Sequence, residues 1–511
     1  MLGDVFERFV QKSPISVMVR AALERVLGAD RLDLWYERTA KKQYTRELLF
    51  SSIYDLMHQV VFCVQPSVRA AYRAQPAEVG TSLVSVYNKL NGLETHTSAE
   101  LVRYSAREFA PLIDTWVINA PPGLRASPFN MCIEIAKPRL YAVVPRNCRK
   151  VSETKMTVSC RRPGFSSSNY DVERGGLEGY RIKIVDGNCL EASEHHIYEL
   201  RSAEGRALPA KSLVVYEPAL GLVSDVFPCE DGHAQERALF GPLLKTVKAG
   251  DLWIEDRNFC TRDFLCEIDN RGACFVTREH RGLRFEILGP LRPCGRTATG
   301  QVAQQRMRVV DEQGKPHIFR RLRLKLNQAT RNGATILHIL TNLPRQVSAQ
   351  RVADLYRKRW TLETAFKHLE AYFHSEINTL GYPKAALFGF CLALVAYNLL
   401  AVVLAALRSV HGEETVEQEV SLYYIANEIT TTYHGMMIAI PEPEWDVFYA
   451  MSKADLADIL VELAQNVRLQ AFRKSPPRPR KPRPQGKKPA RKGHVSTAKL
   501  LMNRKANLAT P

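Results

Sequence analysis

The 511-residue chain has no closely paired cysteines. Its eleven Cys residues are scattered, and no two have the Cys-X-X-Cys spacing of a structural zinc site. The N-terminus, MLGDVFERFVQKS, has no apolar run, so it predicts no secretory signal peptide. These absences argue against a zinc-finger protein and against a secreted, disulfide-linked one. Free thiols in a reducing cytoplasm are the simplest interpretation.

Acidic side chains are missing from the C-terminal stretch. Residues 473–505 contain 13 Lys and Arg and no Asp or Glu, whereas the whole chain has a formal net charge of +18. The rest of the chain therefore has a formal net charge of about 18 − 13 = +5. A basic balance of this kind favours nucleic acid or an anionic membrane surface as a partner. We expect residues 473–511 to be a disordered basic tail, and composition leaves open whether the tail binds DNA or only keeps the chain soluble.

Charge of either sign is missing from residues 385–407, a 23-residue apolar run. The run is long enough to cross a bilayer, but a fully buried helix in a large α/β core has the same composition. Gly389 and Asn398 interrupt the run, Lys384 and Arg408 bound it, and the chain has no second segment like it. We therefore expect a buried core helix and no membrane contact.

Length and composition predict several units, since 45% of the residues are apolar and can bury more than one core. Helical spacing of apolar residues predicts a helical N-terminal region, and alternating patterns predict an α/β segment followed by short strands. The expected organisation is a helical N-terminal region (1–113), an atypical irregular insert (114–177), a first core part (178–264), a β-rich insertion (265–345), a second core part (346–410), a helical C-terminal region (411–472) and the basic tail.

Three acidic residues are expected to meet at one edge of the α/β core. YRIKIVDGN reads as a strand that ends at Asp186, and DLWIEDRNF as one that ends at Asp256. One long helix over residues 348–373 would carry Glu363 beside its buried face. Converging carboxylates repel one another unless cations hold them, and oxygen ligands of this kind suit Mg²⁺ or Mn²⁺. Two such ions support phosphodiester displacement.

Tyr356 and Arg359 precede Glu363 on the same helix. The Arg359–Glu363 pair has the i, i+4 spacing of an ordinary surface salt bridge, and alone it would indicate nothing more. Together with Asp186 and Asp256, however, the pair predicts a cluster of acidic residues with an arginine beside it. Arg359 would clamp a phosphate, and Tyr356 would hydrogen-bond or stack nearby.

These motifs resemble the DDE transposases of the insertion-sequence-four family, whose signature is Tyr, two residues, Arg, three residues, Glu, six residues, Lys. YRKRWTLETAFKHLE matches it at Tyr356, Arg359 and Glu363, VDGN resembles the first-Asp strand, WIEDRNF the second, and ALVAYNLL at 393–400 the helix after the catalytic Glu. The four features occur in the family's order, from about Tyr180 to Leu407, with weaker similarity over 81–110.

The resemblance implies a fold and an activity. The fold is an RNase H-like catalytic core interrupted by a β-rich insertion, between helical N- and C-terminal regions. The activity is Mg²⁺-dependent endonuclease and strand-transfer chemistry, in which two ions (or Mn²⁺) are held by Asp186, Asp256 and Glu363. DNA contacts are expected from Tyr356, Arg359, Lys367 and Arg257, in a nucleoid-associated cytoplasmic homodimer that binds inverted repeats and target DNA.

Some residues depart from the family's pattern or leave a choice open. Glu370 stands where the family has its basic residue, and residues 114–177 resemble nothing in the family. Both departures favour the alternative of a catalytically impaired, transposase-derived DNA-binding protein. The adjacent His195 and His196 are expected to take a structural role. The family's base-receiving aromatic would be one of Phe275, Phe285 and Phe319.

Overall fold

The computed structural model describes residues 3–41, 48–119, 177–190, 206–330, 333–377, 379–475 and 494–509. His195 and His196 lie outside these residues. The predicted irregular insert also lies outside them from 120 to 176. Its first six residues, 114–119, are not irregular as predicted, because they complete a 25-residue helix.

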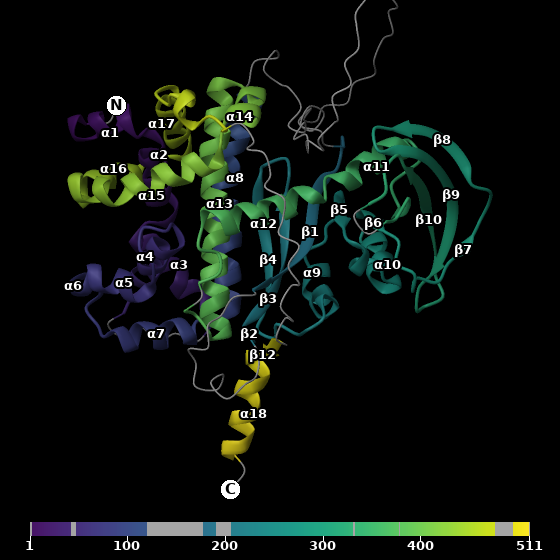
Figure 1. Ribbon diagram of the computed structural model, residues 1–511, viewed down its shortest axis with the longest axis horizontal. Coiled ribbons are helices and arrows are strands. Elements are labelled where there is room, and N and C mark those ends of the chain that lie inside the picture. The colour runs from purple at the N-terminus through teal and green to yellow at the C-terminus, as the bar shows by residue number, and fades with distance from the viewer. Residues whose placement is uncertain are drawn as a thin grey trace, which may run out of the picture.

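Helices from both ends of the chain pack into one module, seen on the left of Figure 1. Apolar faces at helical spacing drive this packing, and α2 contacts α15, α16 and α17 from the other end of the sequence. The N-terminal helices are α1 (Asp4–Lys12), α2 (Pro14–Leu27), α3 (Ala29–Thr39), α4 (Phe50–Val61), α5 (Val68–Ala74), α6 (Pro76–Val79), α7 (Leu83–Gly92) and α8 (Thr95–Asn119). The C-terminal ones are α13 (Pro383–His411), α14 (Glu413–Glu419), α15 (Leu422–Ala439), α16 (Asp446–Ala450) and α17 (Lys453–Gln465), with short 3₁₀ turns η4 (Glu442–Trp445) and η5 (Leu469–Phe472).

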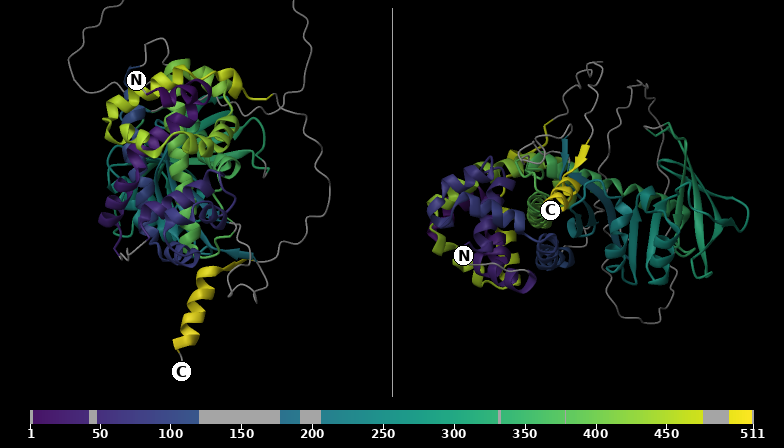
Figure 2. Two further views of the ribbon diagram at one scale, coloured as in Figure 1. Left: turned by 90° about the vertical axis from the view of Figure 1, so that its left-hand side faces the viewer. Right: turned by 90° about the horizontal axis from the view of Figure 1, so that it is seen from below.

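A ten-stranded mixed sheet fills the rest of the molecule, in the order β4-β3-β1-β5-β6-β11-β10-β9-β7, with β8 beside β9. Seen from below, the helical module lies at one end of the molecule, and the strands at the far end of the sheet, β7 to β10, lie at the other (Figure 2). The strands are β1 (Arg181–Leu190), β3 (Ala210–Glu217), β4 (Leu222–Cys229), β5 (Asp251–Glu255), β6 (Cys274–Arg278), β7 (Glu286–Ile287), β8 (Arg292–Thr297), β9 (Gly300–Val310), β10 (Pro316–Leu326) and β11 (Ile336–Thr341). Between them lie η2 (Glu236–Leu239), α9 (Phe240–Leu244), η3 (Arg257–Phe259) and α10 (Arg262–Asn270), and α11 (Ala349–Arg357) and α12 (Trp360–Tyr372) follow.

The first five strands of this path have the order and directions expected of an RNase H-like core. β1 pairs antiparallel with β3, β3 antiparallel with β4, and on the other side β1 and β5, then β5 and β6, are parallel. β6 lies within the segment predicted as the insertion, yet its parallel pairing makes it part of the central sheet. The following strands extend that same sheet.

Alternating side chains place one apolar core on each face of the sheet. Ile184 and Ile254 join the cluster that contains the buried residues of α8, α12 and α13. Val185 and Trp253 belong to the other cluster, with the buried residues of α9 and α10. This two-residue alternation fixes which strand residues can face α12.

α13 is the buried core helix that the sequence predicts. It is long and apolar enough to cross a membrane, but 89% of its most apolar stretch is buried inside the protein. Its neighbours are α8, α17 and β4. Burial on this scale is what a core helix requires, and the length and composition of one such helix are weak grounds for a membrane span.

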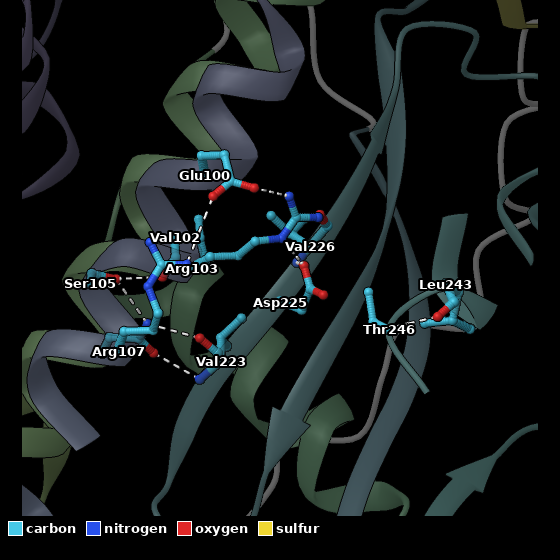
Figure 3. Close-up of polar contacts among 11 residues, drawn as sticks. Glu100, Val102, Arg103, Ser105, Arg107, Val223, Asp225, Val226, Leu243 and Thr246 are labelled. Atoms are coloured by element: carbon cyan, nitrogen blue, oxygen red, sulfur yellow. Dashed lines mark hydrogen bonds and ion pairs between the residues drawn. The ribbon is translucent and has the colours of Figure 1, made fainter. Parts of the chain in front are cut away.

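Polar contacts fasten the helical module to the edge of the sheet (Figure 3). Arg103 on α8 donates to Asp225 Oδ1 at 2.5 Å and to the Val226 carbonyl at 3.1 Å, both on β4. Asn398 on α13 is fully buried, and its side-chain amide makes the two hydrogen bonds that a neighbouring strand would otherwise make. Its Oδ1 accepts from the Val223 amide at 2.7 Å, and its Nδ2 donates to the Val223 carbonyl at 2.9 Å. The edge strand therefore leaves no unpaired backbone group at this position.

The sequence predicts a disordered tail, but the end of the tail forms regular secondary structure. Residues 494–496 form β12 (His494–Ser496), which pairs parallel with β2 (Arg206–Leu208), and α18 (Thr497–Ala509) follows it. α18 projects away from the rest of the molecule in Figure 1. Backbone pairing with a strand about 290 positions earlier has no local sequence pattern to predict it.

Replacing Asn398 with Leu should lower the free energy of unfolding by about 2 to 5 kcal/mol, because the substitution leaves the buried Val223 N–H and C=O groups unpaired. Denaturant unfolding followed by circular dichroism measures the loss. The exposed Asn427, replaced in the same way, is the matched control and should change stability little. Equal effects of the two substitutions would contradict the role given to Asn398.

Candidate active site

Asp186 and Asp256 lie side by side on neighbouring parallel strands. The register pairs Val185 with Glu255, so the two aspartates take the next position on each strand. Both share the sheet face of Ile184 and Ile254, two residues before them, which is the face covered by α12. Asp256 directly follows β5, as predicted. The sequence predicts that the first strand ends at Asp186, but β1 continues to Leu190, where it pairs with β3 alone.

The single helix expected to carry Glu363 is divided in two a few residues before it. α11 ends at Arg357 and α12 begins at Trp360. Across the junction the amides of Lys358, Arg359, Thr361 and Leu362 bond three residues back, at 2.9 to 3.3 Å, where an α-helix bonds four back. The prediction of one continuous helix is therefore wrong. The junction is a tightened 3₁₀ turn whose residues keep right-handed helical dihedral angles, and α12 packs against β1.

Arg359 joins the two elements at that turn. Its Nη1 donates to Asp186 Oδ2 at 2.8 Å, and its Nη2 donates to Glu363 Oε1 at 2.6 Å. The Arg359 and Asp186 side chains are only 12% and 19% exposed, whereas Glu363 is 40% exposed. The guanidinium thus screens two carboxylates that would otherwise repel each other in a poorly hydrated place.

Burial raises the pKa of Asp186 to about 6, against the opposing effects of Arg359 and the Gly187 amide. The charges of Asp256 and Glu363 raise the same pKa further, which shows that the three acids act on one another. A carboxyl poised in this way gains strongly from any added positive charge. Perturbed acids of this kind cluster at functional sites.

Tyr356 lies behind Arg359 and is buried. Burial raises its pKa to about 12, partly offset by the positive charges of Arg359 and Arg278 and by a hydrogen bond with Arg359. The phenol therefore stays neutral near pH 7. Its predicted direct contact with DNA stays a prediction.

The three acids match the chemistry of a hard divalent cation, which prefers carboxylate oxygen. Within the part of the chain that the structure describes, however, no three His, Cys, Asp or Glu side chains are arranged closely enough to hold a metal ion. Arg359 explains this arrangement, because its guanidinium lies between Asp186 and Glu363. The carboxylate donors fit Mg²⁺ or Mn²⁺ by their chemistry.

A basic pocket of about 560 Å³ adjoins the site, starting one residue after Asp256. Its lining includes Arg257, Arg278 and Arg281, and none of these three has an ion-pair partner among the described residues. It also includes Glu279, His280, Ala334, Ile336, Leu337 and His338. Arg257 was expected at a DNA contact; Arg278 and Arg281 were not, although β6 runs parallel to β5 and must end at the same sheet edge.

The other sequence candidates take varied positions. Lys367 and Glu370 are both exposed on α12, with no ion-pair partner in the described segments. Of the candidate aromatic residues of the insertion, Phe275 and Phe319 are buried against each other, with ring centres 5.0 Å apart. Phe285 is half-buried with Arg321 over its ring.

Comparison with known proteins indicates a family for this region of the chain. Residues 177–399 match the family model described as "Transposase DDE domain", and this range contains all three acids. These residues form a transposase DDE domain. The prediction of a DDE transposase family is therefore confirmed, and the finer assignment to the insertion-sequence-four family stays a prediction.

Curated relatives of the chain are named as transposases of insertion sequence elements. The chain is 26% identical over 245 residues to the putative transposase InsL for insertion sequence element IS186A of Escherichia coli strain K12, and equally to the transposase for insertion sequence element IS421 of Escherichia coli. Each match covers 42% of this chain, and it spans 63% of InsL and 62% of the IS421 protein. A piggyBac transposase synaptic complex with hairpin DNA is 11% identical at a TM-score of 0.31, over 55% of this chain and 57% of that one. This last likeness is too distant to add weight.

Replacing Arg359 with Ala should lower the free energy of unfolding by about 3 kcal/mol, because the substitution leaves Asp186 and Glu363 facing each other without a cation. The same variant should gain more thermal stability from added Mn²⁺ than the wild type does. Differential scanning calorimetry with Mn²⁺ or with chelator measures both effects.

Arg262 offers a matched control, since it also bridges two acids, Asp263 at 2.7 Å and Glu312 at 2.6 Å, but on the surface. Arg262→Ala should change stability by less than about 1 kcal/mol and leave the Mn²⁺ effect untouched. If the two variants behave alike, Arg359 does not have the screening role assigned to it.

Proposed function

We propose that this chain is a DNA transposase that cleaves transposon ends and transfers their 3′-hydroxyl ends to target DNA, with two copies holding the two ends. The observation that carries the proposal is the bridge from Arg359 to Asp186 and Glu363, with Asp256 at the next position on the strand that pairs with β1. The DDE domain match over residues 177–399 supports it. The matched region spans 63% of the first relative's length, so the activity of the whole chain is inferred from the site.

The three acids would hold two Mg²⁺ ions, which when bound supply an activated water or 3′-hydroxyl and stabilise the leaving oxygen. Every other contribution comes from this chain's side chains. Arg359, once parted from the carboxylates, has its paired N–H groups available for a DNA phosphate. Tyr356 would help to hold the guanidinium, because its buried hydroxyl oxygen accepts a hydrogen bond from Arg359.

The basic pocket would bind the DNA backbone next to the reacting phosphate. Arg257, Arg278 and Arg281 line a concave surface whose first member directly follows Asp256. Charged groups without protein partners keep their full attraction for phosphate. We assign the strands after β6 to the insertion that this family carries, with the pocket at its junction with the core. Lys367, exposed one turn after Glu363, adds a cation on the other side.

Metal-dependent cleavage of DNA that carries the transposon's inverted repeats tests the proposal. Glu363→Ala should lower the cleavage rate at least about a hundred-fold, because it removes a ligand of the ions. Glu370→Ala is the matched control on the same helix and should cleave normally. Retention of cleavage in Glu363→Ala, Asp186→Ala and Asp256→Ala alike would remove the DDE assignment.

A catalytically impaired, DNA-binding protein is the second candidate, and Glu370 is the observation that favours it. The exposed carboxylate places negative charge where the family has a cation beside DNA. DNA binding by the wild type without any Mg²⁺-dependent cutting would select this candidate. Recovery of cutting in Glu370→Lys would then trace the loss to that single residue.

Arg257→Ala should weaken binding to all DNA sequences about equally, and it should reduce the slope of log affinity against log salt by about 1, as expected for one lost phosphate contact. Fluorescence anisotropy titrations at several salt concentrations, in chelator, measure the slope. Arg271→Ala removes an arginine that is paired with Glu267 at 2.8 Å and should leave the slope unchanged. An unchanged slope in Arg257→Ala would exclude a phosphate contact at the pocket.

A further inference from the structure

The outer strands of the sheet leave one face exposed near the catalytic end. β6 is parallel to β5, and the pairings that join β11, β10, β9 and β8 to it in turn are all antiparallel, so β6, β10 and β8 end on the side of Asp256. Away from that end, α10 packs on β6 and β9, and Met307 and Phe319 are buried there. Nearer the catalytic end, side chains on the same face reach solvent.

The strand register defines the exposed side chains on this face. Arg323 and Lys325 follow the buried Phe319 at even steps along β10, so they share its face. Residues paired across antiparallel strands also share a face. The row through Lys325 contains one residue from each of β8, β9, β10 and β11: Arg296, Gln301, Lys325 and Ile336. Arg323 pairs with His338, and because Ile336 and His338 line the basic pocket, the face continues that pocket outward.

The exposed charges on this face are positive. Arg296, Arg323 and Lys325 are exposed, and none of them has an ion-pair partner in the part of the chain that the structure describes. Glu279, the acid that lines the adjoining pocket, is paired with Arg321. Cations of this kind gain free energy from phosphate, because neutralising the phosphates of DNA releases the counter-ions condensed on it. The face therefore suits a polyanion.

The chemistry of the face favours the backbone of duplex DNA. Stacking of unpaired bases needs exposed aromatic rings, but Phe319 is fully buried and Phe285 is half-buried under Arg321. Guanidinium, ammonium and amide groups bind phosphate oxygens without reading the sequence. Each phosphate contact also contributes more on a duplex, with a salt slope of about 0.9 per contact against about 0.7 on a single strand.

The distance of the face from Asp256 sets which part of the DNA it can reach. β10 is three strands from β5 in the sheet, and β8 is five strands from it. At about 4.8 Å between neighbouring strands, the cations lie about 14 to 24 Å from the catalytic edge. At about 3.4 Å per base pair, this corresponds to about four to seven base pairs from a reacting phosphate.

We propose that Arg296, Arg323 and Lys325, with Gln301 between Arg296 and Lys325, form a docking face for the backbone of duplex DNA that runs from the reacting phosphate across the outer strands. These strands form the right-hand end of the molecule in Figure 1. The inference rests on the proposed function for the place of the duplex in the reaction. The binding itself is separable from cleavage.

The test uses the full chain in chelator, so that no cleavage occurs, and a duplex that carries the inverted repeat and its flanking DNA. Fluorescence anisotropy titrations at several salt concentrations give the slope of log affinity against log salt. The double variant Arg323→Ala/Lys325→Ala should reduce this slope by about 2, as expected for two lost phosphate contacts. Shortening the duplex, from one side, to about three base pairs from the reacting phosphate should remove the difference between wild type and variant, since the face begins about four base pairs away.

Arg292→Ala/Arg306→Ala is the matched control, because it removes two exposed, unpaired arginines of β8 and β9 from the opposite face of the same strands. It should keep the wild-type slope. Circular dichroism should show that both double variants are folded, since all four side chains are on the surface.

A wild-type slope in Arg323→Ala/Lys325→Ala, or equal losses in the two double variants, would overturn the docking face. A dimer that forms without DNA and dissociates in Arg323→Ala/Lys325→Ala would also overturn it, by assigning the face to a second copy. Loss of slope in that variant, in a wild type that cuts no DNA, would uphold the face while the proposed function fails. Cleavage by a wild type whose binding slope the variant shares would do the reverse.

Discussion

The repulsion among three carboxylates at one sheet edge is the constraint on which the site depends. Parallel pairing of β1 and β5 forces Asp186 and Asp256 into neighbouring positions, and α12 adds Glu363. In the described structure a single guanidinium, that of Arg359, offsets this repulsion. Under the proposed function, the same residue would be a counter-ion for the acids without metal and a phosphate ligand once metal replaces it, which would link metal binding to DNA contact in one side chain.

Packing far from the acids keeps this edge in place. Asn398 closes the edge strand β4 with amide bonds, and Arg103 ties α8 to Asp225, so the helical module and the sheet are one body at that point. Arg359 lies in the 3₁₀ turn between α11 and α12 and contacts both Asp186 and Glu363 from there. Asn398 and Arg103 are polar side chains in a largely apolar setting. Leaving their backbone and carboxylate partners unpaired there would be costly, and this cost favours the observed packing over alternatives.

The sequence predicted well what depends on periodicity and spacing. The burial of α13, the position of Asp256 after a strand and the i, i+4 pairing of Arg359 with Glu363 follow from short-range patterns. The helix break was missed because Lys358 and Arg359 include no Gly or Pro, and only tertiary packing tightens the turn. The pocket was missed because it joins residues from 257, 278–281 and 334–338, and the pairing of β12 with β2 because it is equally non-local.

The central claim is that Asp186, Asp256 and Glu363 bind metal ions at one place. Fe²⁺-directed hydroxyl-radical cleavage tests it directly, because Fe²⁺ bound in place of Mg²⁺ cuts the protein backbone within reach of its site. The account predicts fragments that end near residues 186, 256 and 359–363, suppressed by excess Mg²⁺ and absent in Asp186→Asn. Cuts confined to other regions, or the same three cuts in Asp186→Asn, would contradict a shared metal site.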